Sequence, residues 1–347
     1  MFTYIVDLAN RMCQEMDVII AYSTRKQTPK NYEEYFDKRI KLIKVNNFTR
    51  NINPFKDIGA IFEVRKIIKN EKPDIVHMHS SKAGAIGRLS IFSKEIKLFY
   101  TPHGYAFCKK DDSKLKTKLY EMIEKFLGKR KCTTIACSKG EYEESLKVTK
   151  TSMYINNGID CADIDKIVAG KPKKSIDVKK LKICTVGRIG YQKNPKLFNS
   201  IAEKFPEIEF NWIGDGELRE ILTSSNINVT GWCDRKEALL KLCENDIFIL
   251  PSLWEGLPLT LLEAMYLEKI CIVSNVVGNK DVINNGINGF ICETENEYYN
   301  ILEKIINGEI DCEKIKSKSR EKIISEHNVD VAVRKYIEIY RKGDDCY

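Results

Sequence analysis

Short apolar runs alternate along this chain with segments long enough to form helices. Most of the runs are continuous rather than interrupted by polar residues, as in strands that are buried on both faces of a parallel sheet. The sequence therefore predicts an α/β protein assembled from βαβ units. The expected strands are Val18–Tyr22, Ile75–Met78, Leu98–Tyr100, Thr134–Ala136, Tyr154–Ile155, Ile183–Val186, Glu209–Ile213, Asp246–Leu250, Cys271–Val273 and Gly289–Cys292.

A segment without hydrophobic periodicity divides the 347 residues in two. Residues 169–180 contain one glycine, one proline and five lysines, a composition typical of a linker. We expect two doubly wound, Rossmann-like domains that face each other across a cleft, over residues 1–168 and 181–325. Residues 326–347 are expected to form a C-terminal helix that packs back toward the first domain. Ligands of such sheets bind beyond the carboxyl ends of the strands, so the functional motifs should follow strands.

The first residues predict a helix, because Phe2, Ile5, Ala9 and Met12 recur at helical spacing. A doubly wound domain normally opens on a strand that lies centrally in its sheet. We therefore expect the sheet of the first domain to be built without its first strand.

The net charge of +8 is unevenly distributed, since residues 1–180 sum to +14 and residues 181–347 to −6. The basic half could face nucleic acid, anionic lipid or a phosphorylated substrate. We expect no nucleic-acid partner, because the sequence contains no helix-turn-helix, zinc finger or aromatic platform. No apolar run approaches the roughly 18 residues of a membrane span. The twelve cysteines include no CxxC pair, which is typical of a reducing cytoplasm.

The most informative motif, Pro251–Met265, reads PSLWEGLPLTLLEAM and follows an expected strand. Pro258 suits the first turn of the next helix, whose N-terminus would be a place for a phosphate. Glu255 and Glu263 add two carboxylates to this strand end. An isolated pair of glutamates would usually be a helix cap and a surface residue, but here we expect both to hold a nucleotide sugar. The backbone amides expected to contact phosphate are those of Gly256, Leu257 and Leu259.

A second motif, Thr185–Pro195, reads TVGRIGYQKNP and also follows a strand, which ends at Gly187. Arg188 and Lys193 project from the loop after that strand. Arginine offers a planar fork to phosphate oxygens and lysine a point charge, and two fixed cations can neutralise a diphosphate leaving group without a metal. The alternative is a pair of solvated charges on a surface loop.

Two turns that contain glycine follow strands in the same half of the chain. One is IGDGE, with Gly214 and Asp215, and the other is TGWC, with Trp232. Glycine lets a ligand approach the backbone closely, so both turns could contact a bound ligand. Each motif alone is more often a simple turn.

Histidines mark two strand ends in the first half. His103 follows a strand within TPHGY, where it can hydrogen-bond a sugar hydroxyl. His77 and His79 share one face of an earlier strand, and Ser81 and Lys82 after it could seat an anion at a helix N-terminus. Core packing explains these histidines better than a zinc ion does, because no fourth ligand is evident. We expect no metal.

A basic amphipathic helix is expected over Ser113–Gly128. Leu115, Leu119, Met122 and Phe126 fall on one face, and lysines surround them, including Lys109 and Lys110 before the helix. Such a helix can lie on an anionic membrane surface. The alternative is that the apolar stripe is core and the lysines solvate the other faces.

In their order along the chain, the motifs resemble those of the retaining glycosyltransferases of the GT-B fold, family 4, especially bacterial enzymes that build surface polysaccharides. The resemblance covers nearly the whole chain. It comprises E-x7-E at Glu255 and Glu263, GR…QKN at 187–194, GDGE at 214–217, NNGID at 156–160 and TPHG at 101–104.

The resemblance implies a role for each matching residue. Arg188 and Lys193 would hold the donor diphosphate, Glu255 would lie near the donor sugar and Glu263 would hold the ribose hydroxyls. His103 would stand beside the transferred sugar. Phosphate would contact the amides from Gly256 to Leu259, and the uracil would lie by the region of Trp232.

The resemblance also implies chemistry and partners. We expect a UDP-sugar-dependent hexosyltransferase that retains anomeric configuration by a front-face route, without a metal or cofactor. Its acceptor would be a lipid-linked sugar or polysaccharide, and its basic first domain would rest on the inner face of the plasma membrane. Relatives carry a first strand and a Gly-rich loop that this sequence does not show before its opening helix. The alternatives are a non-catalytic nucleotide-sugar-binding partner and a UDP-N-acetylhexosamine epimerase, which would carry more acid/base residues.

Overall fold

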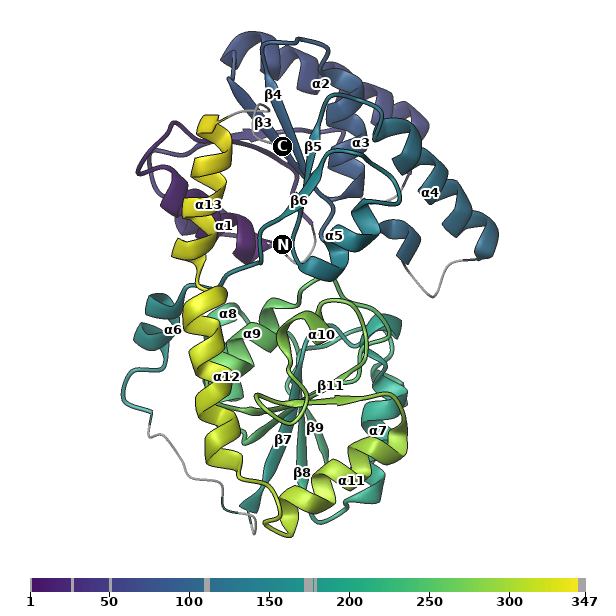
Figure 1. Ribbon diagram of the computed structural model, residues 1–347, viewed down its shortest axis with the longest axis vertical. Helices are drawn as coiled ribbons and strands as arrows, with labels where there is room; N and C mark the ends of the chain where they lie inside the picture. Colours follow the sequence, from purple (N-terminus) through teal and green to yellow (C-terminus); the bar gives the residue numbers. More distant parts are fainter. Residues whose placement is uncertain are drawn as a thin grey trace. The chain divides into compact units, whose positions relative to one another are not determined.

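The computed structural model describes residues 2–25, 28–49, 52–108, 113–171, 177 and 180–342. The chain forms two compact units, Met1–Asn157 with Val329–Tyr347 and Gly158–Asn328 (Figure 1). The first unit therefore ends before the expected boundary at 168. Residues 158–168 belong to the second unit because the helix they contain, α6, packs against α8. Within the expected linker, residues 172–176 and 178–179 lie outside the described residues, as do Lys109 and Lys110.

The first unit contains two parallel sheets rather than one. β1 pairs with β2, and β3, β4, β5 and β6 pair in that order, but no ladder among the described residues joins β1 or β2 to β3. The elements are α1 (Phe2–Met12), β1 (Ile19–Tyr22), η1 (Tyr32–Tyr35), β2 (Lys41–Lys44), α2 (Pro54–Glu71), β3 (Ile75–His79), α3 (Ser81–Ser90), β4 (Lys97–Thr101), η2 (Ala106–Cys108), α4 (Lys114–Leu127), β5 (Thr133–Ala136), α5 (Lys139–Ser145), β6 (Ser152–Tyr154) and α13 (Val329–Lys342).

Side-chain packing replaces the missing ladder between the two sheets. Ala9 and Cys13, from α1 and the residue after it, bury against Ile40 and the apolar side of β1 and β2. A second cluster, built on Val45 and Ala60, joins the end of β2 to α2 and α3. The small sheet is thus attached to the rest of the unit through helices.

The two faces of the larger sheet have different partners. Met78 and Tyr100 lie opposite each other in the β3–β4 ladder and point toward α3. A methyl group at Gly87 would come within 2.1 Å of the Met78 sulfur, so this glycine allows α3 to lie close to the sheet. The other face carries His77, which contacts Tyr340 of α13. Figure 1 shows α1 and α13 on this side, and the two helices pack together.

A buried ion pair orients α4. The Arg88 guanidinium of α3 lies 2.8 Å from Oε2 of Glu124, and both side chains are almost fully buried. Tyr100 donates its hydroxyl to Oε1 of Glu124 at 2.9 Å. With Glu124 and Leu127 turned inward, the predicted apolar stripe of α4 is exposed and is not part of the core.

The second unit is a six-stranded parallel sheet in the order β12-β11-β10-β7-β8-β9. Helices cover both faces, α7 and α11 on one side and α8, α9 and α12 on the other (Figure 1). The elements are α6 (Cys161–Ile167), β7 (Lys182–Val186), η4 (Tyr191–Lys193), α7 (Pro195–Lys204), β8 (Glu209–Ile213), η5 (Arg219–Ile221), β9 (Ile227–Val229), α8 (Arg235–Cys243), β10 (Ile247–Leu250), α9 (Leu259–Tyr266), β11 (Ile270–Ser274), α10 (Asn279–Val282), β12 (Phe290–Cys292), α11 (Glu295–Ile306) and α12 (Cys312–Glu326).

The α/β fold class that the sequence predicts is confirmed in both units, with β2 and β9 as strands that it missed. Among the described residues, no helix has both the length and the apolar character needed to cross a bilayer.

Removing the carboxylate of Glu124 should destabilise the first unit. Glu124→Ala leaves the Arg88 guanidinium buried without its partner, and breaking such a pair costs about 3 to 5 kcal/mol. Glu121→Ala is the matched control, because it removes an exposed ion pair with Lys125 from the same helix and should cost less than about 1 kcal/mol. Urea unfolding followed by far-UV circular dichroism measures both. Equal costs for the two variants would contradict the prediction.

Candidate active site

Four neighbouring strands of the second sheet each end at a predicted site segment. β10 leads into residues 251–259, β7 into Gly187 and Arg188, β8 into Gly214 and Asp215, and β9 into the turn before Trp232. The four strands are parallel and adjacent, so the motifs that were far apart in the sequence meet at one edge of the sheet.

The loops after β7 and β10 contact each other directly. The Leu253 amide donates to the Gln192 carbonyl at 2.8 Å, and Nε2 of Gln192 donates to the Trp254 carbonyl at 2.9 Å. Nζ of Lys193 lies 2.7 Å from Oε1 of Glu255. The side chains of this pair are 16% and 7% exposed, so the predicted diphosphate cation and sugar carboxylate neutralise each other in a largely buried setting.

Arg188 occupies a different environment. Its Nε lies 2.8 Å from Oε2 of Glu217, and both side chains are exposed. Gly187, before it, has a φ of 150°, and a methyl group at Gly214 would come within 2.2 Å of the Gly187 carbonyl oxygen. These two glycines let the backbones at the ends of β7 and β8 approach each other closely. The side chain of Arg188, the next residue, remains exposed to solvent.

The other predicted donor residues of these loops are partly solvated. Asp215 accepts from the Gly216 amide and forms an ion pair of 3.4 Å with Arg219. Trp232 follows Gly231 and is 57% exposed. An exposed indole of this kind presents an apolar ring face to a ligand.

The start of α9 differs from the expectation in one detail. Pro258 is the N-cap residue, with extended backbone, and the helix begins at Leu259, so proline precedes the first turn rather than forming it. Leu257 is buried, and Gly256 lies against the loop after β11, where a methyl group at Gly278 would come within 2.0 Å of the Gly256 carbonyl oxygen. The backbone at Gly256 is therefore held closely by its neighbours.

Glu263 is buried on α9, and burial raises the pKa of its carboxyl group. Nε of Arg235 lies 3.3 Å from Oε1 of Glu263, which opposes that shift. Nη1 of the same guanidinium lies 2.7 Å from Oδ2 of Asp163. Sequence reasoning missed Arg235 and Asp163, because no local pattern links residues that far from Glu263.

In the first unit, His103 lies in a cluster of aromatic and imidazole rings. Its Nε2 lies 3.0 Å from Nδ1 of His79, and the Tyr4 ring meets it edge-on with centroids 4.9 Å apart. The φ of His103 is 53°, a left-handed conformation that turns the chain sharply after β4. His77 bonds to Thr101 and to Tyr340, which is the core role that the sequence favoured for it.

The weak anion site at the start of α3 is occupied by protein groups. Ser81 is the first residue of the helix. Nζ of Lys82 lies 2.7 Å from Oδ1 of Asp57 and donates to the Thr49 hydroxyl at 2.8 Å. The described part of the chain contains no group of three His, Cys, Asp or Glu residues placed to hold a metal ion.

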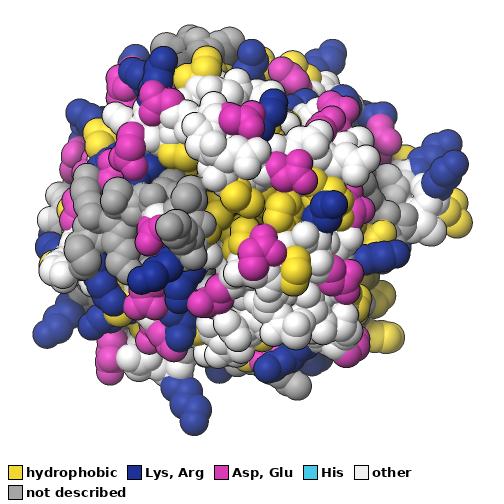
Figure 2. Space-filling model, turned by 90° about the horizontal axis from the view of Figure 1, so that it is seen from below, with side chains coloured by type: hydrophobic (Ala, Val, Ile, Leu, Met, Phe, Trp, Pro, Cys, Tyr) yellow, Lys and Arg dark blue, Asp and Glu magenta, His cyan; other side chains and the backbone are white. Residues whose placement is uncertain are grey.

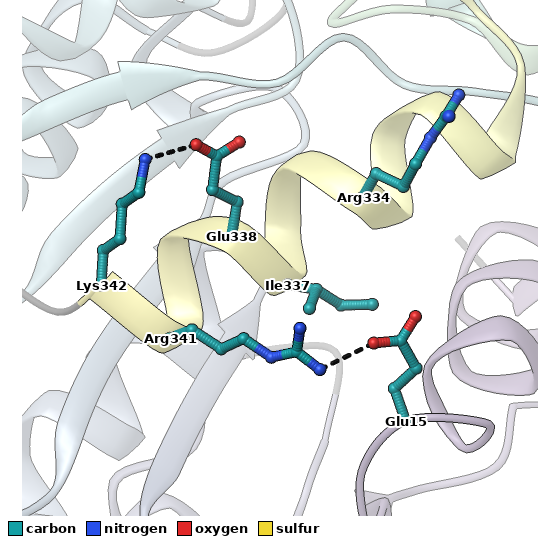
Figure 3. A pocket seen from close by; sticks show the side chains of 6 residues that line it. All are labelled: Glu15, Arg334, Ile337, Glu338, Arg341 and Lys342. Carbon is teal, nitrogen blue, oxygen red and sulfur yellow. Dashed lines mark hydrogen bonds and ion pairs between the residues drawn. The ribbon is translucent and has the colours of Figure 1, made fainter.

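A pocket in the first unit lies away from these groups, over α13 and the segment after α1 (Figure 3). Arg341 is paired with Glu15 at 2.7 Å, and Lys342 is paired with Glu338. The figure shows Arg334 and Ile337 beside them on the same helix. None of the predicted site residues lines this pocket.

Both halves of the chain match glycosyltransferase families. Residues 1–163 match Glycosyltransferase Family 4, and residues 169–322 match Glycosyl transferases group 1. The chain is 32% identical over 345 residues to the UDP-Gal:alpha-D-GlcNAc-diphosphoundecaprenol alpha-1,3-galactosyltransferase of Escherichia coli, which covers 88% of this chain and 85% of that enzyme. The chain is a family 4 glycosyltransferase.

Solved structures agree with the fold of this glycosyltransferase. Sucrose-phosphate synthase from Thermosynechococcus elongatus superposes with a TM-score of 0.79 at 16% identity, covering 98% of this chain and 92% of that one. Anabaena HepE in complex with UDP gives 0.78 at 14% identity, covering 99% and 96%. Both similarities extend over the full GT-B architecture that the resemblance implied.

Truncating Lys193 should destabilise the second unit of the glycosyltransferase. Lys193→Ala leaves the Glu255 carboxylate largely buried without its ammonium partner, at a cost of about 3 kcal/mol. Arg188→Ala breaks a solvent-exposed pair and should cost less than about 1 kcal/mol. All three tryptophans, Trp212, Trp232 and Trp254, lie in this unit, so their fluorescence during urea unfolding measures it selectively. If Lys193→Ala proves as stable as Arg188→Ala, the buried pair does not contribute as described.

The first unit should lose stability in mild acid. Burial lowers the pKa of His79 to about 4 and that of His103 well below its usual value, with His79 adding to the shift at His103. Between about pH 6.5 and 4 the unfolded chain therefore binds protons that the folded unit does not, and the free energy of unfolding falls as the pH falls. Far-UV circular dichroism in urea across this range measures the slope. His79→Asn should flatten it, and an unchanged slope would contradict the prediction.

Proposed function

We propose that this glycosyltransferase moves a sugar from a UDP-sugar to a lipid-linked acceptor, with retention of configuration and without a metal ion. The observation that carries the proposal is the 32% identity, over 88% of the chain, with an enzyme whose name specifies UDP-galactose and a diphosphoundecaprenol-linked acceptor. UDP-galactose is accordingly the first donor to test. The reaction belongs to the synthesis of a cell-surface polysaccharide.

The charges at the second sheet support a diphosphate site. We propose that Arg188 and Lys193 neutralise the negative charge that develops on the leaving UDP, which is the role a metal ion would otherwise fill. The exposed pair between Arg188 and Glu217 is weak, so a diphosphate can compete for this guanidinium. Lys193 and Glu255 would remain a unit, with Glu255 also facing the donor sugar.

The nucleoside would contact residues near these two cations. We propose that Glu263, held in place by Arg235, accepts hydrogen bonds from the ribose hydroxyls. The exposed ring of Trp232 offers a face for the uracil. The backbone from Gly256 to Leu259 would contact the phosphates, and two loops, one with Gly187 and the other with Gly214 and Asp215, would complete the donor site.

In the first unit, we propose that His103 contacts the transferred sugar. Its lowered pKa keeps the imidazole neutral at pH 7, so it can donate or accept a hydrogen bond with a sugar hydroxyl. A weak anion contact at Ser81 and Lys82 would require displacement of Asp57. We also propose that the enzyme is cytoplasmic and that its basic first unit is attracted to the anionic inner face of the plasma membrane.

The test measures UDP release by purified chain from a panel of UDP-sugars, with GlcNAc-diphosphate on a short, water-soluble lipid as acceptor. Arg188→Ala should lower kcat by about a hundredfold, as expected for loss of a charge that acts in the transition state. Lys182→Ala is the matched control, because its exposed pair with Glu209 lies at the opposite end of β7 and should leave turnover unchanged.

Three outcomes separate the parts of the proposal. Turnover by Arg188→Ala at the rate of the unaltered chain would contradict the diphosphate site. Binding of every UDP-sugar without turnover would favour a non-catalytic binding partner instead. Proton NMR of the product gives the anomeric configuration, and activity that persists in excess chelator is the result expected for a metal-independent reaction.

A further inference from the structure

The first unit exposes large apolar side chains on α2, on α4 and just after α3, the helix that packs against both. We call this surface the α2–α4 face and define it by Phe55 and Phe62 of α2, Phe92 after α3, and Leu115 and Phe126 of α4. These side chains are 89%, 62%, 61%, 81% and 67% exposed, respectively. Folded proteins rarely leave several such residues together in water unless the surface binds something.

The α2 part of the face is a single stripe. Phe55, Ile58 and Phe62 follow one another at intervals of three and four residues, so they lie on one side of the helix. The same stripe continues into Arg65 and Lys69, which are also exposed. The helix therefore presents an apolar half and a basic half to the same side.

Cationic side chains connect this stripe to α4. The Arg65 guanidinium lies 5.9 Å from the centre of the Phe62 ring and 5.5 Å from that of Phe92. The Arg130 guanidinium lies 4.4 Å from the Phe92 ring, and Phe126, in the last turn of α4, precedes Arg130 by four residues. α3 packs against both α2 and α4 (Figure 1), and Phe92 after α3 contacts both Arg65 of α2 and Arg130, which follows α4.

The orientation of α4 makes its exposure permanent. Glu124 points inward to its buried ion pair with Arg88, which leaves Leu115, Leu119 and Met122 on the solvent side. The segment 113–131 carries seven basic and two acidic residues, and Glu124 is one of the two. Exposed lysines surround the stripe, namely Lys114, Lys116, Lys118, Lys125, Lys129 and Lys131.

We propose that the α2–α4 face inserts its apolar side chains into the headgroup region of an anionic bilayer while its lysines contact lipid phosphates. An amphipathic surface with a basic rim is the form that binds such bilayers. A second copy of the chain fits less well, because two faces of the same sign repel. On the face drawn in Figure 2, by contrast, basic and acidic side chains are intermixed. The inference rests on the proposed function in that the lipid-linked acceptor lies in the same bilayer.

Vesicle flotation tests the proposal directly. The unaltered chain should float with vesicles of phosphatidylcholine and phosphatidylglycerol, and far less with phosphatidylcholine alone. Phe55→Ser with Phe126→Ser should weaken binding by more than about tenfold, because two large apolar groups no longer insert. Lys118→Gln and Lys129→Gln should each weaken it by about fivefold, an effect that salt masks. Ile287→Ser with Ile324→Ser is the matched control, because it removes two exposed apolar residues of the second unit.

Insertion into the bilayer can be measured with tryptophans added to the face, because all three native tryptophans lie in the second unit. Phe55→Trp and Phe126→Trp each place a reporter on the face, and brominated lipid in the anionic vesicles should quench the added fluorescence. Ile324→Trp should not be quenched. Circular dichroism of each variant verifies that the fold is retained.

Two results would overturn the proposal. One is vesicle binding that the paired serine substitutions do not weaken. The other is a dimer in sedimentation velocity that these substitutions abolish while vesicle binding is absent, which would assign the face to a second copy. Turnover of the water-soluble acceptor should be unchanged in the serine variants. Vesicle binding without any turnover would count against the proposed function alone.

Discussion

The parallel direction of the strands in the second sheet is the constraint on which the site depends. Because β10, β7, β8 and β9 run the same way, every loop that follows a strand emerges at one edge. Charged groups gathered in that way must neutralise one another, and the structure resolves them into pairs. Lys193 and Glu255 form a buried pair, Arg188 and Glu217 form a solvated pair, and Arg235 pairs with Glu263. The difference in burial leaves the Arg188 side chain more exposed to solvent than that of Lys193.

The fold could be predicted where burial alone sets the residue pattern. β7, β10 and β11 are buried almost throughout and consist mostly of apolar residues, and β8 alternates buried apolar residues with the half-buried Glu209 and Asn211. β2 was missed because Lys41 and Lys44 bracket only two apolar residues, and β9 because it is a three-residue edge strand. Both strands form through pairing with a neighbour, which no local window contains. The division of the first unit into two sheets is likewise a matter of pairing rather than of pattern.

The candidate site could be predicted in its strand-end residues but not in the groups that hold them. Gln192 directly precedes Lys193 in the sequence, so its position beside a predicted site residue could have identified it. Arg235 and Asp163 carry no such signal, because Arg235 contacts Glu263 and Asp163 only when α6, α8 and α9 pack. The contact between His79 and His103 also depends on tertiary structure, since β3 and β4 must pair in register before their ends meet.

The α4 helix shows why an amphipathic pattern does not state which face is inside. Its apolar stripe would ordinarily be assigned to the core, and its lysines to solvent. Here Arg88, on another helix, is itself buried and requires a carboxylate, which Glu124 supplies from the opposite side of α4. Rotating the stripe inward would leave that guanidinium buried without a partner, at a cost of about 3 to 5 kcal/mol. The exposed apolar surface therefore accompanies the ion pair, and it persists for as long as the first unit is folded.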